Sequence, residues 1–297
     1  MKSAYMKYIS SLLMFGTNGI VASYILLNSY EIVFWRTLIG GLFLLLVFIW
    51  TKQKFQFFIN KIHLLYLLIS GVAMGASWMF LYEAFTQIGV SIATLAYYCG
   101  PVIVMILSPL IFKEKLTSAK IVGFLAVIIG LICVNGQVSS EGGTYWGFIC
   151  GILSAIMYAV MVIFNKKAKT ITGLENSMWQ LFTSFLTVSI FIGIKQGFSV
   201  GISQGSLLPI LLLGVVNTGI GCYLYFSSIG SLSVQTVSIL GALEPLSALI
   251  FSAAILGEKL SPIQMIGAVL IIGGAAIGEL YRKNKNEQIE NKETIVL

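Results

Sequence analysis

Two stretches of this chain, FKEKLTSAKIVG at Phe112–Gly123 and LGEKLSPIQMIG at Leu256–Gly267, contain the same short polar phrase. Each has Glu-Lys-Leu followed by Thr or Ser, and each lies between long apolar runs. The copies stand 144 residues apart, so that Glu114 corresponds to Glu258. Repetition of this kind indicates that the chain consists of two related halves.

The same register extends through most of both halves. Apolar composition can explain matching leucines, but it does not easily explain glutamate, tryptophan and proline in one register. The first helix of each half needs a shorter offset, near 140 residues, which aligns Tyr5 with Tyr145. The pairs at 144 residues include Glu31 with Glu175, Trp35 with Trp179, Gly75 with Gly219, Pro101 with Pro245, Ser108 with Ser252 and Gly130 with Gly274.

Composition places the chain in a membrane. It has 297 residues, of which 58% are hydrophobic and 10% charged, against about a quarter charged in soluble domains. Segments of roughly 20 apolar residues can each span a bilayer as a helix. Ten such spans are predicted, at 8–27, 31–50, 63–85, 91–112, 118–135, 145–164, 175–194, 207–229, 233–256 and 262–280. They are too long for barrel strands.

The positive charges predict how these spans are oriented. With a cytoplasmic N-terminus, Lys195 and Lys259 face outward, Arg36 lies within a span, and fifteen basic residues face the cytoplasm. Both termini are then cytoplasmic. This orientation explains the net charge of +7, and nucleic-acid binding is not needed to account for it. The inward residues are Lys2, Lys7, Lys52, Lys54, Lys61, Lys113, Lys115, Lys120, Lys166, Lys167, Lys169, Arg282, Lys283, Lys285 and Lys292.

Five spans per half is an odd number, so the second half must enter the membrane from the opposite side. The predicted fold is therefore an all-α integral membrane protein of ten helices in two inverted five-helix repeats, at residues 5–136 and 145–280. Such halves enclose a cavity near the middle of the membrane. The mixed-charge tail, residues 281–297, is predicted to be disordered.

Enzymatic chemistry is not expected. The chain has no aspartate and a single histidine, His63, and it lacks a phosphate-binding loop. Its four cysteines lie singly in apolar runs, which favours packing over disulfides or metal binding. An intramembrane enzyme would need a nucleophile and base at one depth, and these residues do not provide such a pair. No cofactor or metal site is predicted.

Glu244 is the strongest single candidate for a functional residue. It lies near the middle of the ninth span, where a carboxylate is costly and usually faces a cavity or a partner. Pro245 follows it and is expected to kink the helix, as is the matching Pro101. The carboxylate could carry a proton, face a solute, or merely stabilise the kink. Because Gly100 occupies the matching position, a symmetric two-carboxylate scheme is not expected.

Aromatic and amide residues supply further candidates. Tyr97 and Tyr98 precede Pro101 and could line a cavity or bond to neighbouring carbonyls. Asn18 and Asn217 could bind a solute, although hydrogen bonding between helices is the commoner use of such residues. Other residues of this kind are Trp78 and Tyr82, which share a helix face, and Tyr223 and Tyr225 in the eighth span. Arg36, a charge within the second span, is interpreted as structural.

The phrases YYCGPVIVMILSPLIFKEKLTSAKIVG and LEPLSALIFSAAILGEKLSPIQMIGAVLIIGG resemble the EamA family of the drug/metabolite transporter superfamily. The resemblance covers about residues 5–279. It implies a ten-helix carrier of the cytoplasmic membrane that moves small metabolites such as amino acids, often outward. It also implies a central cavity, which in this chain would involve Asn18, Trp78, Tyr82, Tyr97, Tyr98, Tyr158, Asn217, Tyr223 and Glu244.

The leading hypothesis is therefore secondary transport of an amino acid or related metabolite by alternating access. Its partners would be the small-molecule substrate, the lipid bilayer and a proton as candidate coupling ion. Facilitated diffusion, import of an amine or nucleoside, and a non-transporting sensor or scaffold are the alternatives. Whether the protein is a monomer or homodimer stays open.

Overall fold

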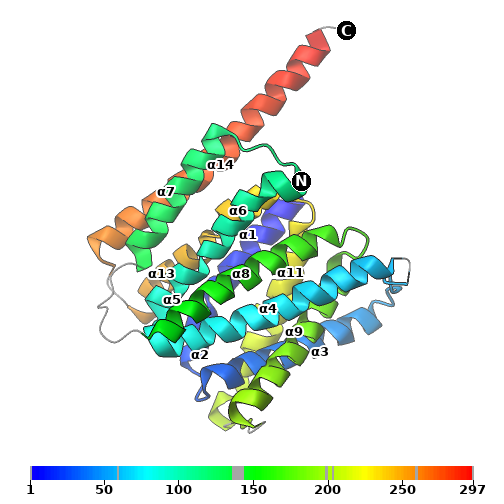
Figure 1. The fold of residues 1–297 in the computed structure, drawn as a ribbon, viewed down its shortest axis with the longest axis vertical. Helices are drawn as coiled ribbons and strands as arrows, with labels where there is room; N and C mark the ends of the chain where they lie inside the picture. Colours follow the sequence, from blue (N-terminus) through cyan, green and yellow to red (C-terminus); the bar gives the residue numbers. More distant parts are fainter. Residues whose placement is uncertain are drawn as a thin grey trace.

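The computed structural model describes residues 2–58, 60–135, 144–197, 200–202, 204–257 and 260–295. The regular structure of these residues is helical throughout, as the composition predicted (Figure 1). The helices are α1 Lys2–Gly16, α2 Asn18–Ser23, α3 Ser29–Trp50, α4 Lys61–Ile88, α5 Val90–Tyr97, α6 Cys99–Phe112, α7 Ser118–Asn135, α8 Tyr145–Lys167, α9 Gly173–Gln196, η1 Gln204–Ser206, α10 Leu207–Leu212, the π-helix η2 Leu213–Ile220, α11 Gly221–Ile229, α12 Val234–Leu240, α13 Leu243–Leu256 and α14 Pro262–Ile295.

Among the described residues, seven helices are long and apolar enough to cross a membrane. The qualifying helices are 29–50, 61–88, 92–112, 145–167, 173–196, 207–229 and 234–255, with mean hydropathies from 1.5 to 2.4. Two shorter apolar helices, 118–134 and 262–278, accompany them. A bundle with this many apolar helices is a multi-pass membrane protein.

Several helices are interrupted inside the bundle. α1 and α2 are separated at Thr17, α5 and α6 at Tyr98, and α12 and α13 at Gly241 and Ala242. The second and third interruptions come just before Pro101 and Pro245, whose rings clash with the carbonyl four residues earlier. Irregular backbone inside a membrane bundle is tolerated where it lines a cavity.

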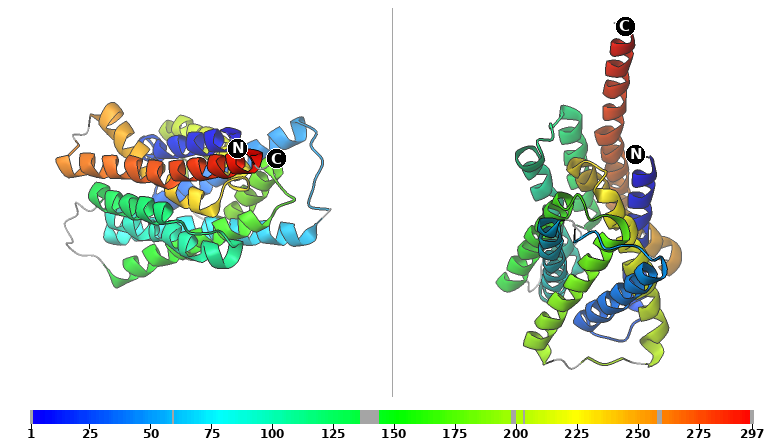
Figure 2. Two further views of the ribbon diagram at one scale, coloured as in Figure 1. Left: turned by 90° about the horizontal axis from the view of Figure 1, so that it is seen from above. Right: turned by 90° about the vertical axis from the view of Figure 1, so that its right-hand side faces the viewer.

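Packing brings together helices that are far apart in the sequence. α4 packs against α8 and α9, α11 against α1, and η2 against α3. α6 packs against α8, α13 against α1, and α3 against α9. α7 and α14 lie side by side along one flank of the molecule (Figures 1 and 2). All of these contacts join residues from opposite halves of the chain.

The α7–α14 contact depends on two pairs of glycines. A Cβ atom on Gly123 would lie 2.5 Å from the carbonyl oxygen of Gly274, and one on Gly130 would lie 2.7 Å from that of Gly267. The backbones therefore touch at both points, as small residues permit between helices in lipid.

Carboxylates at the starts of α3 and α9 bind loops of the opposite half. The Glu31 carboxylate accepts a hydrogen bond from the backbone N–H of Gly201 (3.3 Å). The Glu175 carboxylate accepts bonds from the backbone N–H groups of Gln56 (2.7 Å) and Phe57 (3.1 Å). Phe57 and Gly201 are themselves 144 residues apart, so the two halves make equivalent bonds to one another.

α14 continues as a helix to Ile295 and extends beyond the bundle (Figure 1). Composition predicted disorder from Tyr281 onward, but this segment has no glycine or proline to end a helix. Glu258 and Lys259 of the second polar phrase lie outside the described residues.

Candidate functional site

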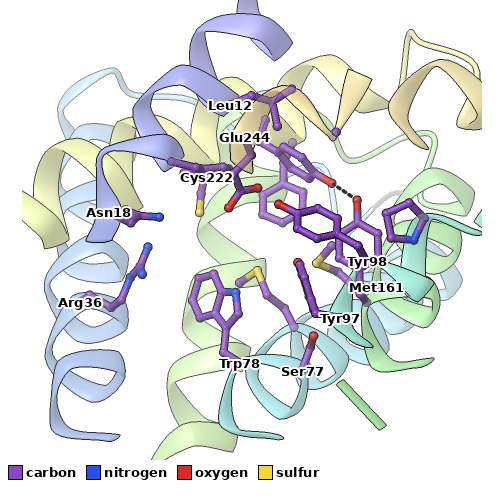
Figure 3. A pocket seen from close by; sticks show the side chains of 17 residues that line it. Leu12, Asn18, Arg36, Ser77, Trp78, Tyr97, Tyr98, Met161, Cys222 and Glu244 are labelled. Carbon is purple, nitrogen blue, oxygen red and sulfur yellow. Dashed lines mark hydrogen bonds between the residues drawn. The ribbon is translucent and has the colours of Figure 1, made fainter. Parts of the chain in front are cut away.

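A cavity lies in the centre of the bundle, where the interrupted helices meet (Figure 3). Its inner chamber of about 80 Å³ continues into a wider space of about 630 Å³. The two parts share Phe15, Asn18, Arg36, Trp78, Tyr97, Tyr98 and Glu244. A small metabolite is of the size that such a space can enclose.

The wider space opens toward one end of the bundle. Its walls include Ala22 of α2, Phe85 of α4 and Gln264 of α14, and these lie close to the ends of α2 and α4 and the start of α14. We call this the open end. The opposite end, where α1 and α4 begin, is the closed end.

Hydrogen bonds between helices close the other end of the cavity. The Tyr8 hydroxyl donates to the carbonyl oxygen of Val237 (2.8 Å) and thereby joins α1 to α12. The hydroxyls of Tyr158 and Tyr225 lie 3.4 Å apart and join α8 to α11. All four of these residues are buried, so the inner chamber ends at this layer.

A second layer of polar contacts lies beyond it. The Glu114 carboxylate accepts from the backbone N–H groups of Val234 (2.8 Å) and Gln235 (3.2 Å) at the start of α12. The Gln235 amide donates to the Ser108 hydroxyl (2.9 Å) and accepts from Lys120 (2.6 Å). Glu114 of the first polar phrase therefore bonds across the bundle to a helix of the other half.

Two charged side chains face the cavity from different walls. Arg36 of α3 is only 5% exposed, and its Nε donates to the Thr218 hydroxyl (2.9 Å). Its guanidinium lies 4.9 Å from the centre of the Trp78 ring. Glu244, in the first turn of α13, points into the same space (Figure 3). The structure thus brings a cation and an anion to one cavity.

Aromatic rings make up much of the remaining wall. Tyr97 contacts Tyr158 edge-on at 5.3 Å between ring centres and Tyr98 at 5.5 Å. A Cβ atom on Gly100 would lie 2.7 Å from the Tyr158 ring. The absence of a carboxylate at position 100 therefore has a steric reason, because Tyr158 occupies the space that a side chain would need.

Most of the residues expected in the cavity line it. Two do not: Asn217 bonds to the α1–α2 region instead, and Tyr223 lies beneath Lys7, with the ammonium 5.8 Å from its ring centre.

Arg36 was expected to be structural, yet it lines the cavity. The sequence feature that could have indicated this is a charge inside a membrane span. The expected residues found in the wall are Asn18, Trp78, Tyr82, Tyr97, Tyr98, Tyr158, Glu244, Pro101 and Pro245. Tyr225, named only as a further candidate, also lines the cavity, and the residues that the sequence did not point to include Leu12, Phe15, Met74, Ser77, Met161, Cys222 and Phe226.

Asn217 holds the interruption between α1 and α2. Its side-chain amide donates to the Met14 carbonyl (2.8 Å), the Thr17 hydroxyl (2.8 Å) and the Asn18 side chain (3.0 Å). Replacing Asn217 with Leu keeps the volume but removes the donor of these three hydrogen bonds, which we expect to lower the free energy of unfolding by about 2 kcal/mol. Thermal unfolding in detergent measures the change. Val216→Leu, on the half-exposed neighbour, is the control, and equal stability of the two variants would contradict the assignment.

A multi-pass helical bundle with a solute-sized, charged cavity is typical of membrane transporters. The model of the EamA-like transporter family matches residues 2–136 and 145–278. The chain therefore belongs to the EamA-like transporter family.

Individual relatives agree with this membership. The uncharacterized transporter YxxF of Bacillus subtilis is 27% identical over 95% of this chain and 91% of its own. A protein of Salmonella typhimurium named as a probable amino-acid metabolite efflux pump is 27% identical over 63% of this chain and 66% of its own. One solved crystal structure superimposes with a TM-score of 0.79 at 18% identity, covering 94% of this chain and 99% of that one, which shows a shared fold.

Proposed function

We propose that this chain is a secondary transporter that exports a small metabolite, an amino acid or a related compound, by alternating access. The observation that carries the proposal is a charged central cavity that is open at one end and closed at the other by bonds between the two halves. A carrier needs this arrangement in one of its states, with the opposite arrangement in another.

The packing supports ten helices in two inverted repeats. The correspondence pairs α1 with α8, α3 with α9, α4 with α10–α11, α5–α6 with α12–α13, and α7 with α14. Under it, the contact of α4 with α8 is equivalent to that of α11 with α1, and the contact of α6 with α8 to that of α13 with α1. Gly123 corresponds to Gly267 and Gly130 to Gly274, so the contact of Gly123 with Gly274 is equivalent to that of Gly267 with Gly130. A pseudo-two-fold axis in the membrane plane would produce all of these equivalences.

The charges support an orientation in the cytoplasmic membrane. The positive-inside rule places the N-terminus, and with it the closed end, in the cytoplasm. The C-terminal end of α14 lies at the same end of the bundle (Figure 2). In this orientation the cavity faces the outside, as it would after releasing an exported solute.

Solute flux tests the proposal. Purified protein in proteoliposomes loaded with unlabelled solute should accumulate the same labelled solute by counterflow, with amino acids, amines and nucleosides tried in turn. Flux of an amino acid supports the leading assignment, and flux of an amine or nucleoside alone replaces it with that alternative. Flux of none of them would favour a non-transporting sensor or scaffold.

Glu244 is the proposed site of proton coupling. Glu244→Gln removes the titratable group but keeps the shape, so flux driven by a pH gradient should fall by roughly tenfold, the change expected for 1.4 kcal/mol. Counterflow, which needs no net proton movement, should fall less. Ser252→Ala alters the cavity wall without altering a charge and is the control. An unchanged response of Glu244→Gln to the pH gradient would remove this residue from the coupling role.

A further inference from the structure

Arg36 and Glu244 are both charged, both face the cavity, and do not pair with each other. Among the described residues, the ion pair within 4.0 Å is that of Lys195 with Glu83, and Arg36 and Glu244 are not joined by one. Within the described part of the chain, Arg36 makes one hydrogen bond, from Nε to Thr218, and its two terminal nitrogens make none. The Glu244 carboxylate likewise receives no hydrogen bond from the described residues, while its backbone carbonyl accepts from Ser247 (2.8 Å).

Leaving such charges unpaired inside a protein is costly. A buried ion without a partner is destabilising by several kcal/mol, and proteins usually satisfy such groups. Glu83 is an example in this chain: it is 3% exposed, it bonds to Lys195 at 3.0 Å, and it accepts a hydrogen bond from the Tyr30 hydroxyl. By contrast, Arg36 is buried and Glu244 is partly exposed to the cavity, and among the described residues neither has an ion-pair partner, so both charges are available to a ligand.

The surroundings hold the arginine in a binding geometry. The Trp78 ring lies beneath the guanidinium at 4.9 Å, and the Thr218 hydroxyl fixes Nε. Both contacts leave the two terminal nitrogens directed to the cavity, beside Asn18 (Figure 3). A guanidinium presented in this way is suited to a carboxylate, which it can bind through two parallel hydrogen bonds.

The two charges also break the symmetry of the halves. At the sequence offset of 144 residues between the halves, Arg36 corresponds to Gln180 and Glu244 to Gly100. Gln180 bonds to the Ser70 hydroxyl (2.6 Å), and Gly100 is covered by Tyr158. The cavity therefore has one positive and one negative wall, and a solute with a charge at each end would be bound in one orientation.

We propose that Arg36 and Glu244 together determine specificity for a zwitterionic solute, with Arg36 binding its carboxylate and Glu244 its ammonium group. This inference rests on the proposed transport function. It adds to that function the prediction that the protein recognises both charges of the solute. The carboxylate is bound by Arg36 and the ammonium group by Glu244, from opposite walls of the cavity.

Three molecules with the same isobutyl side chain test the inference. Leucine carries both charges, 3-methylbutylamine only the ammonium, and 4-methylpentanoate only the carboxylate. The same trio is built for each amino acid that shows flux, and binding is measured by thermal shift of the purified full chain and by competition with labelled solute. In the wild-type protein the zwitterion should bind about 10- to 100-fold more tightly than either analogue, the range for a hydrogen bond to a charged group.

The variants separate the two charges. Arg36→Gln should bind the zwitterion and the amine equally, and Glu244→Gln should bind the zwitterion and the acid equally. Arg36→Lys keeps the positive charge and should retain part of the preference, even if Arg36→Gln fails to fold. A wild-type protein that binds the amine or the acid as tightly as the zwitterion would overturn the inference, as would an unchanged preference in Arg36→Lys and both Gln variants. Absence of flux for every solute in the wild type would instead overturn the transport function itself.

Discussion

Replacing Gly274 with Ala is expected to separate α7 from α14 and to destabilise the protein severely. The added Cβ would lie 2.5 Å from the carbonyl oxygen of Gly123 and 3.0 Å from the backbone nitrogen of Val127. Both are backbone atoms, which cannot rotate away as a flexible side chain can. Overpacking of a tight contact usually costs 1–3 kcal/mol, and we expect a loss of about 3 kcal/mol or more because two backbones must move.

The neighbouring glycine provides a matched control. Gly273 lies one residue earlier in α14, and a Cβ there would meet nothing within 4 Å. Gly273→Ala should therefore be neutral or stabilising by up to about 1 kcal/mol, because alanine is the better helix former. Thermal unfolding in detergent, with retention of monodisperse protein after heating, measures both. Equal stability of the two variants would show that the α7–α14 contact is looser than described.

Replacing Gly19 with Trp is expected to abolish transport while the protein stays folded. Gly19 is exposed in the wall of the wider space, and a Cβ there would meet nothing within 4 Å. The indole would extend into the route between the inner chamber and the open end. Flux should fall by more than about tenfold, since a solute site loses its ligand when the space that encloses it is filled.

Gly230→Trp is the control for that variant. Gly230 is also exposed with no neighbour within 4 Å of a Cβ, but it follows α11 at the closed end and lies away from the cavity wall. It should keep wild-type flux and the wild-type unfolding temperature. Normal flux in Gly19→Trp, with both variants folded, would mean that the solute does not pass through the wide part of the cavity.

The sequence was sufficient to predict the class of protein. Apolar runs of spanning length led to an all-helical membrane protein, and the phrases around Glu114 and Pro245 led to the transporter family that the comparisons support. The interruptions before Pro101 and Pro245 follow from the missing N–H and the ring of proline, which are local properties. Local chemistry of this kind can be read without knowing which helices are neighbours.

The site was only partly predictable for the same reason. Glu244 stands out because a carboxylate inside a span is costly wherever its helix packs. Arg36 looks like a structural residue in the sequence, and its place in the cavity depends on how α3 faces the other helices. For Asn217, hydrogen bonding between helices was the commoner expectation, and its three hydrogen bonds do reach α1 and the start of α2.

The sequence by itself determined that this chain is a helical membrane protein, because hydrophobicity acts along the chain, and its phrases around Glu114 and Pro245 led to the transporter family that its model matches. Only the tertiary structure decided that Glu114 joins the start of α12, that Gly123 and Gly274 touch, and that Arg36 and Glu244 face one cavity unpaired. These are contacts between segments more than one hundred residues apart. Their geometry depends on how the helices pack, and no local pattern in the sequence encodes it.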